Sequence, residues 1–367
     1  MNARVDVLNA GSNVFVTGAT GLIGGELVRA LVQQPVGKVW TLIRPSPDAD
    51  PATRLVQRLR RSGAGEGTLG VHAVAGDVRL PHLGLAADDL DEIQRDADII
   101  IHSAAETSFI RAAACRQTNI AGAQNLIEFA RSARRRPLLV CLSTAYVSGA
   151  VANVCLSETS GLGDAHHNEY TRSKAVAEDL FRSSGLPVLV VRPSIVLSAG
   201  LPDEQFARAI LGFLPWSTVF EAVPIDPAAR ADTVPVQFVV QSIVRLLQVP
   251  RRKHDCYHIS AGTQGSACYA EFSAVVDRFY GRARPLQLIH PSQWTRELHR
   301  RCIATPQQRR VFGQLRNYLP FLNMNVLYDN ARLREELGDK FPELPPLASY
   351  FGELLALMAK PRLTAAS

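Results

Sequence analysis

The stretch VFVTGATGLIGGEL, residues 14–27, decides the fold of this 367-residue chain. Its β-branched and aromatic start predicts a strand, and the residues from Leu22 onward have the apolar spacing of a helix. Between them Gly18, Gly21 and Gly24 follow a G-x-x-G-x-x-G pattern. A bare backbone there lets a pyrophosphate approach the amides at the start of the helix. The stretch therefore predicts a dinucleotide site whose contacts come from these residues: Gly18, Thr20, Gly21, Leu22, Ile23 and Gly24.

Short β-branched runs alternate with amphipathic helical segments through the first half of the chain. We expect strands at 14–17, 39–43, 71–76, 98–102, 138–142 and 188–192, with helices such as 22–33 and 119–133 between them. This order is typical of an α/β fold with a doubly wound parallel sheet, the Rossmann architecture. A helix over 236–247 and a strand over 256–260 look like a return to the sheet.

The domain organisation follows from where this regularity fails. We expect an NADP-binding Rossmann domain from residues 1–197 plus about 231–262. The remainder, about 198–230 plus 263–367, is interrupted by proline and mostly helical, which predicts a smaller, mostly helical C-terminal substrate-binding cap.

Composition and charge exclude several classes of protein. The net charge of +6 comes mainly from arginine and is not accompanied by any nucleic-acid-binding motif, so we expect no nucleic-acid partner. The six cysteines have no metal-ligand or C-x-x-C spacing, which predicts reduced thiols and no metal site. Neither a signal peptide nor a run of about 18 apolar residues occurs, so we expect a cytoplasmic protein without a transmembrane segment. Peripheral membrane contact and the choice between monomer and homodimer stay open.

The end of the second predicted strand, in WTLIRPS, indicates which dinucleotide binds. A ribose-binding carboxylate would suit NAD, but the chain has Arg44 at this position. An arginine can stack on adenine and pair with a 2′-phosphate, which predicts NADPH/NADP+ as the cofactor. Arg54 on the next helix is a second candidate, although a solvated helix face explains it equally well.

Three later strand ends supply the remaining cofactor contacts. Asp77 closes the third strand and can accept a hydrogen bond from the adenine amino group, with Val78 beside it. Ala104 and Ala105 follow the fourth strand and are small enough for the cofactor to pass closely. Pro193 follows the sixth strand, near the expected position of the nicotinamide.

Tyr170 and Lys174, in EYTRSKAVAE, lie one helical turn apart and face the same way. They follow the fifth strand and precede the sixth, where a nicotinamide would lie over the carboxyl edge of the sheet. We expect the Lys174 cation and an oxidised nicotinamide to lower the pKa of Tyr170, and Lys174 also to hold the ribose of the cofactor. Thr144, or less favourably Ser143, supplies a hydroxyl for the substrate carbonyl. Asn119 is a further catalytic candidate, with a helix cap as the alternative.

Two apolar segments are not needed by the cofactor domain. Residues 209–220, AILGFLPWSTVF, predict a lid that would line an acyl tunnel. Near the C-terminus, apolar residues recur at helical spacing: Leu347, Tyr350, Phe351, Leu354, Leu355 and Met358. Packing of this face on the cap is favoured over a substrate tunnel or a membrane surface.

Taken together, TGATGLIG, GDV, IIHSAAETSF, CLSTAYVSG, EYTRSK and VRPS resemble the extended short-chain dehydrogenases/reductases. ADTVPVQFVV, CYHISAG and the closing YLPFLNMNVLYDNARLREELG resemble one branch, the fatty acyl-CoA reductases of the male-sterility type and thioester reductase domains. Gln237 departs from the acidic residue usual after VPV in that branch. The resemblance covers most of residues 12–262. It implies that NADPH reduces an acyl-CoA or acyl-carrier-protein thioester to an aldehyde, and leaves open further reduction to the alcohol.

Two other functions fit the residues. The same site could act on a hydroxyl or ketone of a sterol-like or nucleotide-sugar substrate. A non-catalytic NADP-binding protein is the third reading, and the intact set of Thr144, Tyr170 and Lys174 argues against it.

Overall fold

The centre of the computed structural model, which describes residues 7–61, 71–198 and 219–359, is a seven-stranded parallel sheet. Its order is β12-β7-β5-β4-β1-β2-β3. The strands are β1 (Val14–Thr17), β2 (Val39–Ile43), β3 (Val71–Ala75), β4 (Ile99–His102), β5 (Leu138–Leu142), β7 (Val188–Pro193) and β12 (Cys256–Ile259). The predicted doubly wound α/β fold is confirmed, and all seven carboxyl ends point to one edge.

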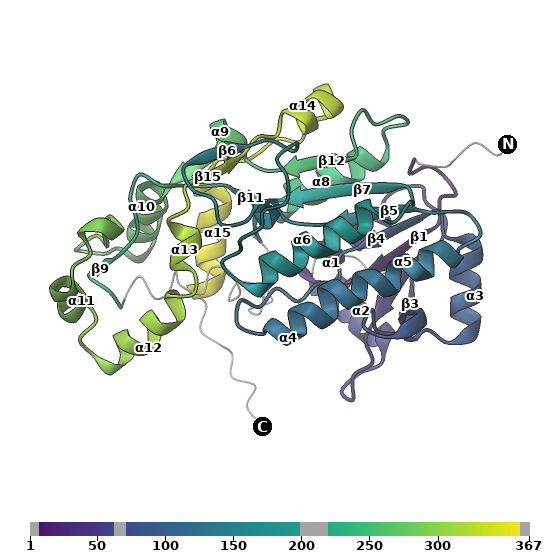
Figure 1. Cartoon of the computed structure of the whole chain (residues 1–367), viewed down its shortest axis with the longest axis horizontal. Helices are drawn as coiled ribbons and strands as arrows, with labels where there is room; N and C mark the ends of the chain where they lie inside the picture. Colours follow the sequence, from purple (N-terminus) through teal and green to yellow (C-terminus); the bar gives the residue numbers. More distant parts are fainter. Residues whose placement is uncertain (1–6, 62–70, 199–218, 360–367) are drawn as a thin grey trace.

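Helices cover both faces of this sheet (Figure 1). Helices α1 (Leu22–Leu31), α2 (Pro51–Arg61), α8 (Val236–Leu247) and α14 (Ala331–Leu337) pack on one face, and α3 (Ala87–Asp96), α5 (Gly122–Ser132) and α6 (Glu169–Arg182) on the other. Alternate strand residues serve the two layers, because side chains alternate along a strand. Val14 and Val16 lie in the core with α1 and α8, whereas Phe15 lies in the core with α3, α5 and α6.

The helix predicted over 119–133 begins earlier than expected. Helix α4 (Ala112–Cys115) runs into a π-helical turn, Arg116–Ala121, which continues into α5. Asn119 is therefore inside a continuous helical segment, and its alternative interpretation as a helix cap is wrong. Such π turns are rare and often occur at functional sites.

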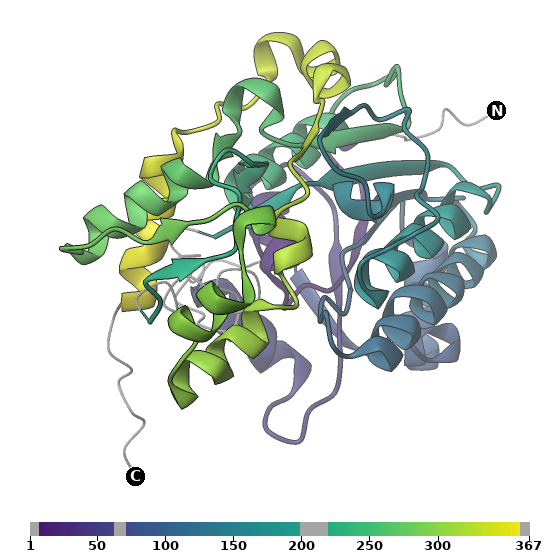
Figure 2. The same cartoon turned by 60° about the vertical axis from the view of Figure 1, so that its left-hand side comes forward.

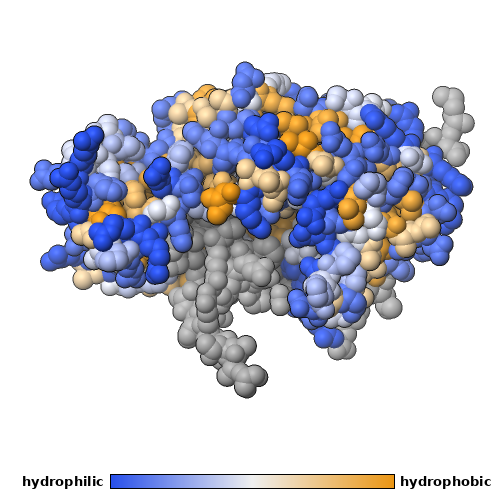
Figure 3. Space-filling view, turned by 60° about the horizontal axis from the view of Figure 1, so that its bottom comes forward, coloured by the Kyte–Doolittle hydropathy of each residue, from blue (hydrophilic) through white to orange (hydrophobic). Residues whose placement is uncertain are grey.

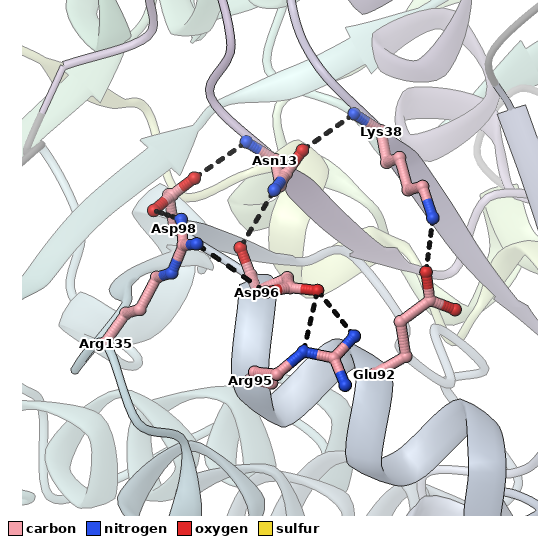
Figure 4. Close-up of polar contacts among 7 residues, drawn as sticks. All are labelled: Asn13, Lys38, Glu92, Arg95, Asp96, Asp98 and Arg135. Atoms are coloured by element: carbon pink, nitrogen blue, oxygen red, sulfur yellow. Dashed lines mark hydrogen bonds and ion pairs between the residues drawn. The ribbon is translucent and has the colours of Figure 1, made fainter.

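A polar network closes the amino edge of the sheet (Figure 4). The backbone amide of Asn13 donates to the Asp98 carboxylate at 2.9 Å. The Asn13 side chain donates to the Asp96 carbonyl at 3.1 Å and accepts from the backbone amide of Lys38 at 2.8 Å. Arg135 pairs with Asp98 at 3.0 Å. These contacts fix the starts of β1, β2 and β4 relative to one another.

The second unit of the structure packs beside the carboxyl edge and has its own hydrophobic core (Figure 2). Its helices are α9 (Gly262–Gly265), α10 (Tyr269–Tyr280), α11 (Arg296–Cys302), α12 (Pro306–Leu315), α13 (Leu319–Leu322) and α15 (Leu347–Ala359). Short strand pairs connect its parts: β6 (Val154–Leu156) with β15 (Val326–Tyr328), β8 (Ile195–Leu197) with β11 (Thr233–Pro235), β9 (Ala222–Val223) with β14 (Gln287–Leu288), and β10 (Arg230–Ala231) with β13 (Ala267–Cys268). Four single helical turns also occur within the described residues: Pro81–Gly84, Ala145–Ser148, Pro291–Gln293 and Gly338–Lys340.

The two predicted apolar segments differ in outcome. Tyr350, Phe351, Leu354 and Leu355 of α15 are buried in the core of the cap, as expected for ordinary packing. Of the predicted lid, residues 209–218 lie outside the described residues. Within the described ranges, no helix is long and apolar enough to cross a membrane. The proposed domain boundaries stay a prediction.

Candidate active site

The glycine-rich turn brings two strand ends into backbone contact. Gly18 has φ +75°, and a Cβ there would lie 2.5 Å from the backbone nitrogen of Ala104. The Gly21 amide donates to the Gly18 carbonyl at 2.9 Å, and α1 begins at the next residue. Side chains are thereby kept away from the amides at the start of α1, and this bare helix terminus fits a pyrophosphate.

Beside this turn lies a cavity of about 390 Å³, here called the cofactor cavity. It brings together nine of the predicted cofactor contacts: Gly18, Thr20, Gly21, Arg44, Arg54, Asp77, Val78, Ala104 and Ala105. Gly24 does not line it. Gly24 packs against the Gly18 carbonyl instead, so its role is to let the turn and helix approach each other.

Four arginines line the cofactor cavity, and the sequence reasoning found only two of them. Arg44 is exposed, and the Arg54 guanidinium donates to the backbone carbonyl of Arg44. Arg58, which was missed, is only 5% exposed and donates to the carbonyls of Gly21 at 3.3 Å and Leu22 at 3.2 Å. Its position one turn after Arg54 on α2 is the signal that would have found it.

Arg79 was also missed, and it changes the interpretation of Asp77. Its guanidinium pairs with the Asp77 carboxylate at 2.6 Å. Burial opposes ionisation of Asp77, but hydrogen bonds from Arg79 and the charges of Arg79 and Arg44 outweigh it and lower its pKa. The carboxylate is therefore charged and held by Arg79, so any adenine contact would use its remaining lone pairs.

A second cavity, of about 340 Å³, lies on the other side of the turn and is here called the substrate cavity. It shares Gly21, Ser103 and Ala105 with the cofactor cavity. Its lining includes five further predicted cofactor contacts, Leu22, Ile23, Tyr170, Lys174 and Pro193, but not the predicted catalytic residue Thr144. Most of its described lining is aromatic or aliphatic, and Lys174 is the only charged side chain in that part of it.

The structure separates the roles of the two neighbouring hydroxyls after β5. The Ser143 hydroxyl donates to the buried Glu178 carboxylate at 2.6 Å, and Glu178 also pairs with Arg192 at 2.7 Å. The Thr144 hydroxyl donates to the Pro193 carbonyl at 3.4 Å, and it opposes the rise that burial causes in the pKa of Tyr170. Ser143, not Thr144, lines the substrate cavity, and the catalytic role of Thr144 stays a prediction.

The expected effect of Lys174 on Tyr170 is not found. Burial raises the pKa of Tyr170 to about 12, and the hydrogen bond with Thr144 is what opposes this rise. The Lys174 ammonium instead donates to the Leu142 carbonyl at 2.5 Å, and burial lowers its own pKa. Tyr170 is thus a protonated phenol at neutral pH, the form that donates a proton.

Asn119 connects the two cavities without lining either. Its side chain accepts from the Glu106 amide at 2.8 Å and donates to the Glu106 carbonyl at 3.0 Å. It also donates to the Ser173 hydroxyl on α6 at 2.8 Å. Asn119 therefore holds the loop after β4 against the helix that carries Tyr170 and Lys174, which makes it a positioning residue.

Aromatic rings close the substrate cavity, and the sequence reasoning missed them. Phe109 stacks on Tyr170 with ring centres 6.0 Å apart, and it contacts Tyr318 at 5.0 Å and Phe321 at 4.9 Å. Phe109 follows β4. Tyr318 directly precedes α13, and Phe321 belongs to that helix. The catalytic tyrosine candidate is therefore covered by an aromatic cluster from both units.

The family model described as male sterility protein matches residues 16–243, more than half of the chain. Nonribosomal peptide synthetase asaC of Aspergillus flavus is 29% identical over 267 residues, which cover 67% of this chain and 26% of that protein. Fatty acyl-CoA reductase wat of Drosophila melanogaster is 27% identical over 275 residues, 63% of this chain and 53% of that protein. The chain thus spans about half or less of these two relatives.

Among solved structures, the terminal R domain from the myxalamid PKS-NRPS biosynthetic pathway superposes with a TM-score of 0.79. It is 22% identical, and the match covers 95% of this chain and 91% of that domain. At this identity the likeness concerns the fold, including the arrangement of the cap on the sheet.

Proposed function

The chain belongs to the male sterility protein family, a branch of the extended short-chain dehydrogenases/reductases, and from that premise we propose that it reduces an acyl thioester to an aldehyde. The observation that carries the proposal is that Tyr170 and Lys174 line the substrate cavity, with Thr144 beside Tyr170. This cavity opens against the glycine turn of the nicotinamide-binding domain through shared residues.

The proposed chemistry assigns proton transfer to Tyr170. A bound NADPH supplies the hydride that forms the new C–H bond at the thioester carbonyl carbon. The carbonyl π electrons move to oxygen, which takes the proton of the Tyr170 phenol, while Thr144 holds that oxygen by a hydrogen bond. Tyr170 takes the proton back as the C–S bond of the hemithioacetal breaks. The thiolate leaves and gains its proton from solvent, and the aldehyde remains.

The choice of NADPH over NADH rests on charge in the cofactor cavity. Arg44, Arg54, Arg58 and Arg79 line it. The two carboxylates in its described lining are both paired, Asp77 with Arg79 and Glu106 with Arg111. Guanidinium groups pair strongly with phosphate, whereas a carboxylate free to hold ribose hydroxyls would favour NADH. We assign Arg44 to the 2′-phosphate because it is the exposed arginine at the end of β2.

The carrier of the acyl group is proposed from the surface of the cap. Six exposed arginines and one exposed glutamate lie on α11, on α12 and directly after α12: Arg296, Arg300, Arg301, Arg309, Arg310, Arg316 and Glu297. None of the six arginines forms an ion pair with a described residue. This end of the molecule is largely hydrophilic (Figure 3). The surface continues into α13, whose Phe321 lines the substrate cavity, so it fits an acidic carrier protein that delivers a phosphopantetheine arm.

The alternative nucleotide-sugar substrate fits the cavity less well. A nucleotide diphosphate needs cations or several hydrogen-bond donors, but Lys174 is the only charged group in the described lining. The six free thiols are consistent with the proposed cytoplasmic location.

The test is NADPH oxidation with octanoyl-pantetheine, octanoyl-CoA and an octanoyl carrier protein, with the aldehyde trapped and counted against NADPH. We expect one aldehyde per NADPH, and a kcat about 10² to 10⁴ lower in Tyr170→Phe. The proposal fails if no thioester is reduced while a ketone or secondary alcohol is turned over. Tight NADPH binding with no turnover of either class would instead favour the non-catalytic protein.

A further inference from the structure

Next to the substrate cavity the cap contains a smaller apolar cavity of about 50 Å³, here called the cap chamber. Val276 of α10 and Leu315 of α12 form two of its sides. Its floor is the β9–β14 pair, in which Val223 lies opposite Leu288. Apart from Ser273 and Tyr269, the described lining is entirely hydrocarbon, so the chamber suits a hydrocarbon group.

Two aromatic rings separate the cap chamber from the substrate cavity. Tyr269 and Phe272 line both cavities. They lie one turn apart on α10 with ring centres 5.9 Å apart, and each is 8% exposed. Phe272 also packs edge-on against Phe351 at 5.2 Å, and Phe351 lines the substrate cavity. A change of these two side chains would join the chamber to the cavity that contains Tyr170.

The helix that carries this wall is anchored at its first turn. The Tyr269 amide donates to the Ala229 carbonyl at 3.0 Å, and Glu271 caps α10 by accepting from the Cys268 amide at 2.7 Å. The anchored start of α10 therefore sets where the two rings lie in the cap. Unfilled apolar space destabilises a core, and an apolar group that enters it regains the lost contacts.

We propose that the cap chamber receives the distal end of an aliphatic acyl chain whose thioester carbonyl is held at Tyr170. Tyr269 and Phe272 then determine the chain length at which the chamber begins to fill. This inference rests on the proposed thioester reduction, and it adds the aliphatic class of the acyl group and the place of its tail.

The experiment measures kcat/KM for a series of straight-chain acyl N-acetylcysteamine thioesters, from acetyl to dodecanoyl in steps of one carbon. Val276→Leu and Val223→Ile each add one methylene to the chamber, from opposite walls. Ala274→Leu is the matched control, because Ala274 lies on α10, is exposed and lines neither cavity. Phe272→Ala opens the wall, and thermal unfolding of each variant reports whether it is folded.

In the parent, kcat/KM is expected to rise by up to about fourfold per carbon over the lengths that fill the chamber, since a buried methylene contributes about 0.8 kcal/mol. In both filling variants the rise should end about one carbon earlier. In Phe272→Ala the chain length at which the rise begins should change. Ala274→Leu should match the parent. Folded filling variants that keep the parental length profile would overturn the chamber assignment, as would a parent that reduces all lengths equally. Those two results leave thioester reduction intact, whereas failure to reduce any thioester would overturn the proposed function itself.

Discussion

The cofactor cavity and the substrate cavity meet at Gly21, Ser103 and Ala105, but they differ in chemistry and in origin. The cofactor cavity is polar and lined by four arginines, and its described residues come from the first four strand–helix units. The substrate cavity is aromatic and draws on segments from Gly21 to Phe351. A charged, locally encoded cavity suits a common cofactor, whereas an apolar cavity assembled from distant segments can vary with the substrate.

The largest expected effect is on the substrate side, from Tyr170→Phe. The phenol is the proposed proton donor, and general acid catalysis contributes about 10² to 10⁴ in rate. We expect kcat to fall by that factor, while the Kd for NADPH, measured by fluorescence titration, stays close to the parental value. Tyr280→Phe, a matched change in the cap away from both cavities, should leave kcat unchanged. A kcat near that of the parent in Tyr170→Phe would refute the assignment.

The pKa of Tyr170 also leads to a prediction for the pH dependence of the reduction rate. A proton donor is lost as the pH rises through its pKa, and burial raises the pKa of Tyr170 to about 12. The reduction rate in single turnover should therefore show no loss from Tyr170 deprotonation between neutral pH and about pH 9. A loss centred near neutral pH that disappears in Tyr170→Phe would show that the phenol titrates much lower than its burial indicates.

On the cofactor side, Arg44→Ala should reduce the preference for NADPH. A hydrogen bond to a charged group contributes about 1.5–3 kcal/mol, so the ratio of the Kd values for NADH and NADPH should fall by about 10- to 100-fold. The Kd for NADH should hardly change. Arg95→Ala is the control, because Arg95 pairs with Asp96 at the amino edge of the sheet, far from the cofactor (Figure 4). If the ratio is unchanged in Arg44→Ala, Arg44 does not bind the 2′-phosphate, and the assignment is wrong.

The sequence predicted the cofactor side better than the substrate side for a physical reason. The strands at 14–17, 39–43 and 138–142 were predicted with the bounds that the structure has, because buried parallel strands are continuous apolar runs. Tyr170 and Lys174 were predicted because residues one helical turn apart lie on the same face of a helix. Phe109 and Phe321 were not, since they meet only through packing of the cap on the sheet. Arg79 was missed because its side chain turns back onto Asp77, which strand periodicity does not show.

A smaller effect is expected at Asn119, which couples the two cavities. Asn119→Asp keeps an acceptor for the Glu106 amide but removes the donors to the Glu106 carbonyl and to Ser173. Displacement of α6 and of the loop after β4 should lower kcat about tenfold and also raise the KM for NADPH, because reaction depends on alignment of both partners.

A matched asparagine separates coupling from general destabilisation. Asn125 lies on α5 and donates only to the Val78 carbonyl, at 2.8 Å, on the cofactor side. Asn125→Ala should therefore raise the KM for NADPH and leave kcat unchanged. If both variants change the same kinetic constant, or if Asn119→Asp changes only the melting temperature, Asn119 has no positioning role in the reaction.

The smallest expected effect concerns the exposed surface of the cap, where neither cavity is altered. Arg300→Glu and Arg309→Glu reverse charges on α11 and α12, and single exposed ion pairs contribute only about 0.2–1 kcal/mol. Each variant should therefore raise the KM for an acyl carrier protein by up to about fivefold. The effect should fade as salt is added, because exposed charges are screened. The KM for acyl-pantetheine, which lacks the carrier surface, should not change, and Arg95→Glu at the opposite edge of the sheet should affect neither substrate. An equal rise with acyl-CoA would show that the arginines contact the phosphates of a nucleotide carrier, and no rise with any substrate would remove α11 and α12 from substrate delivery.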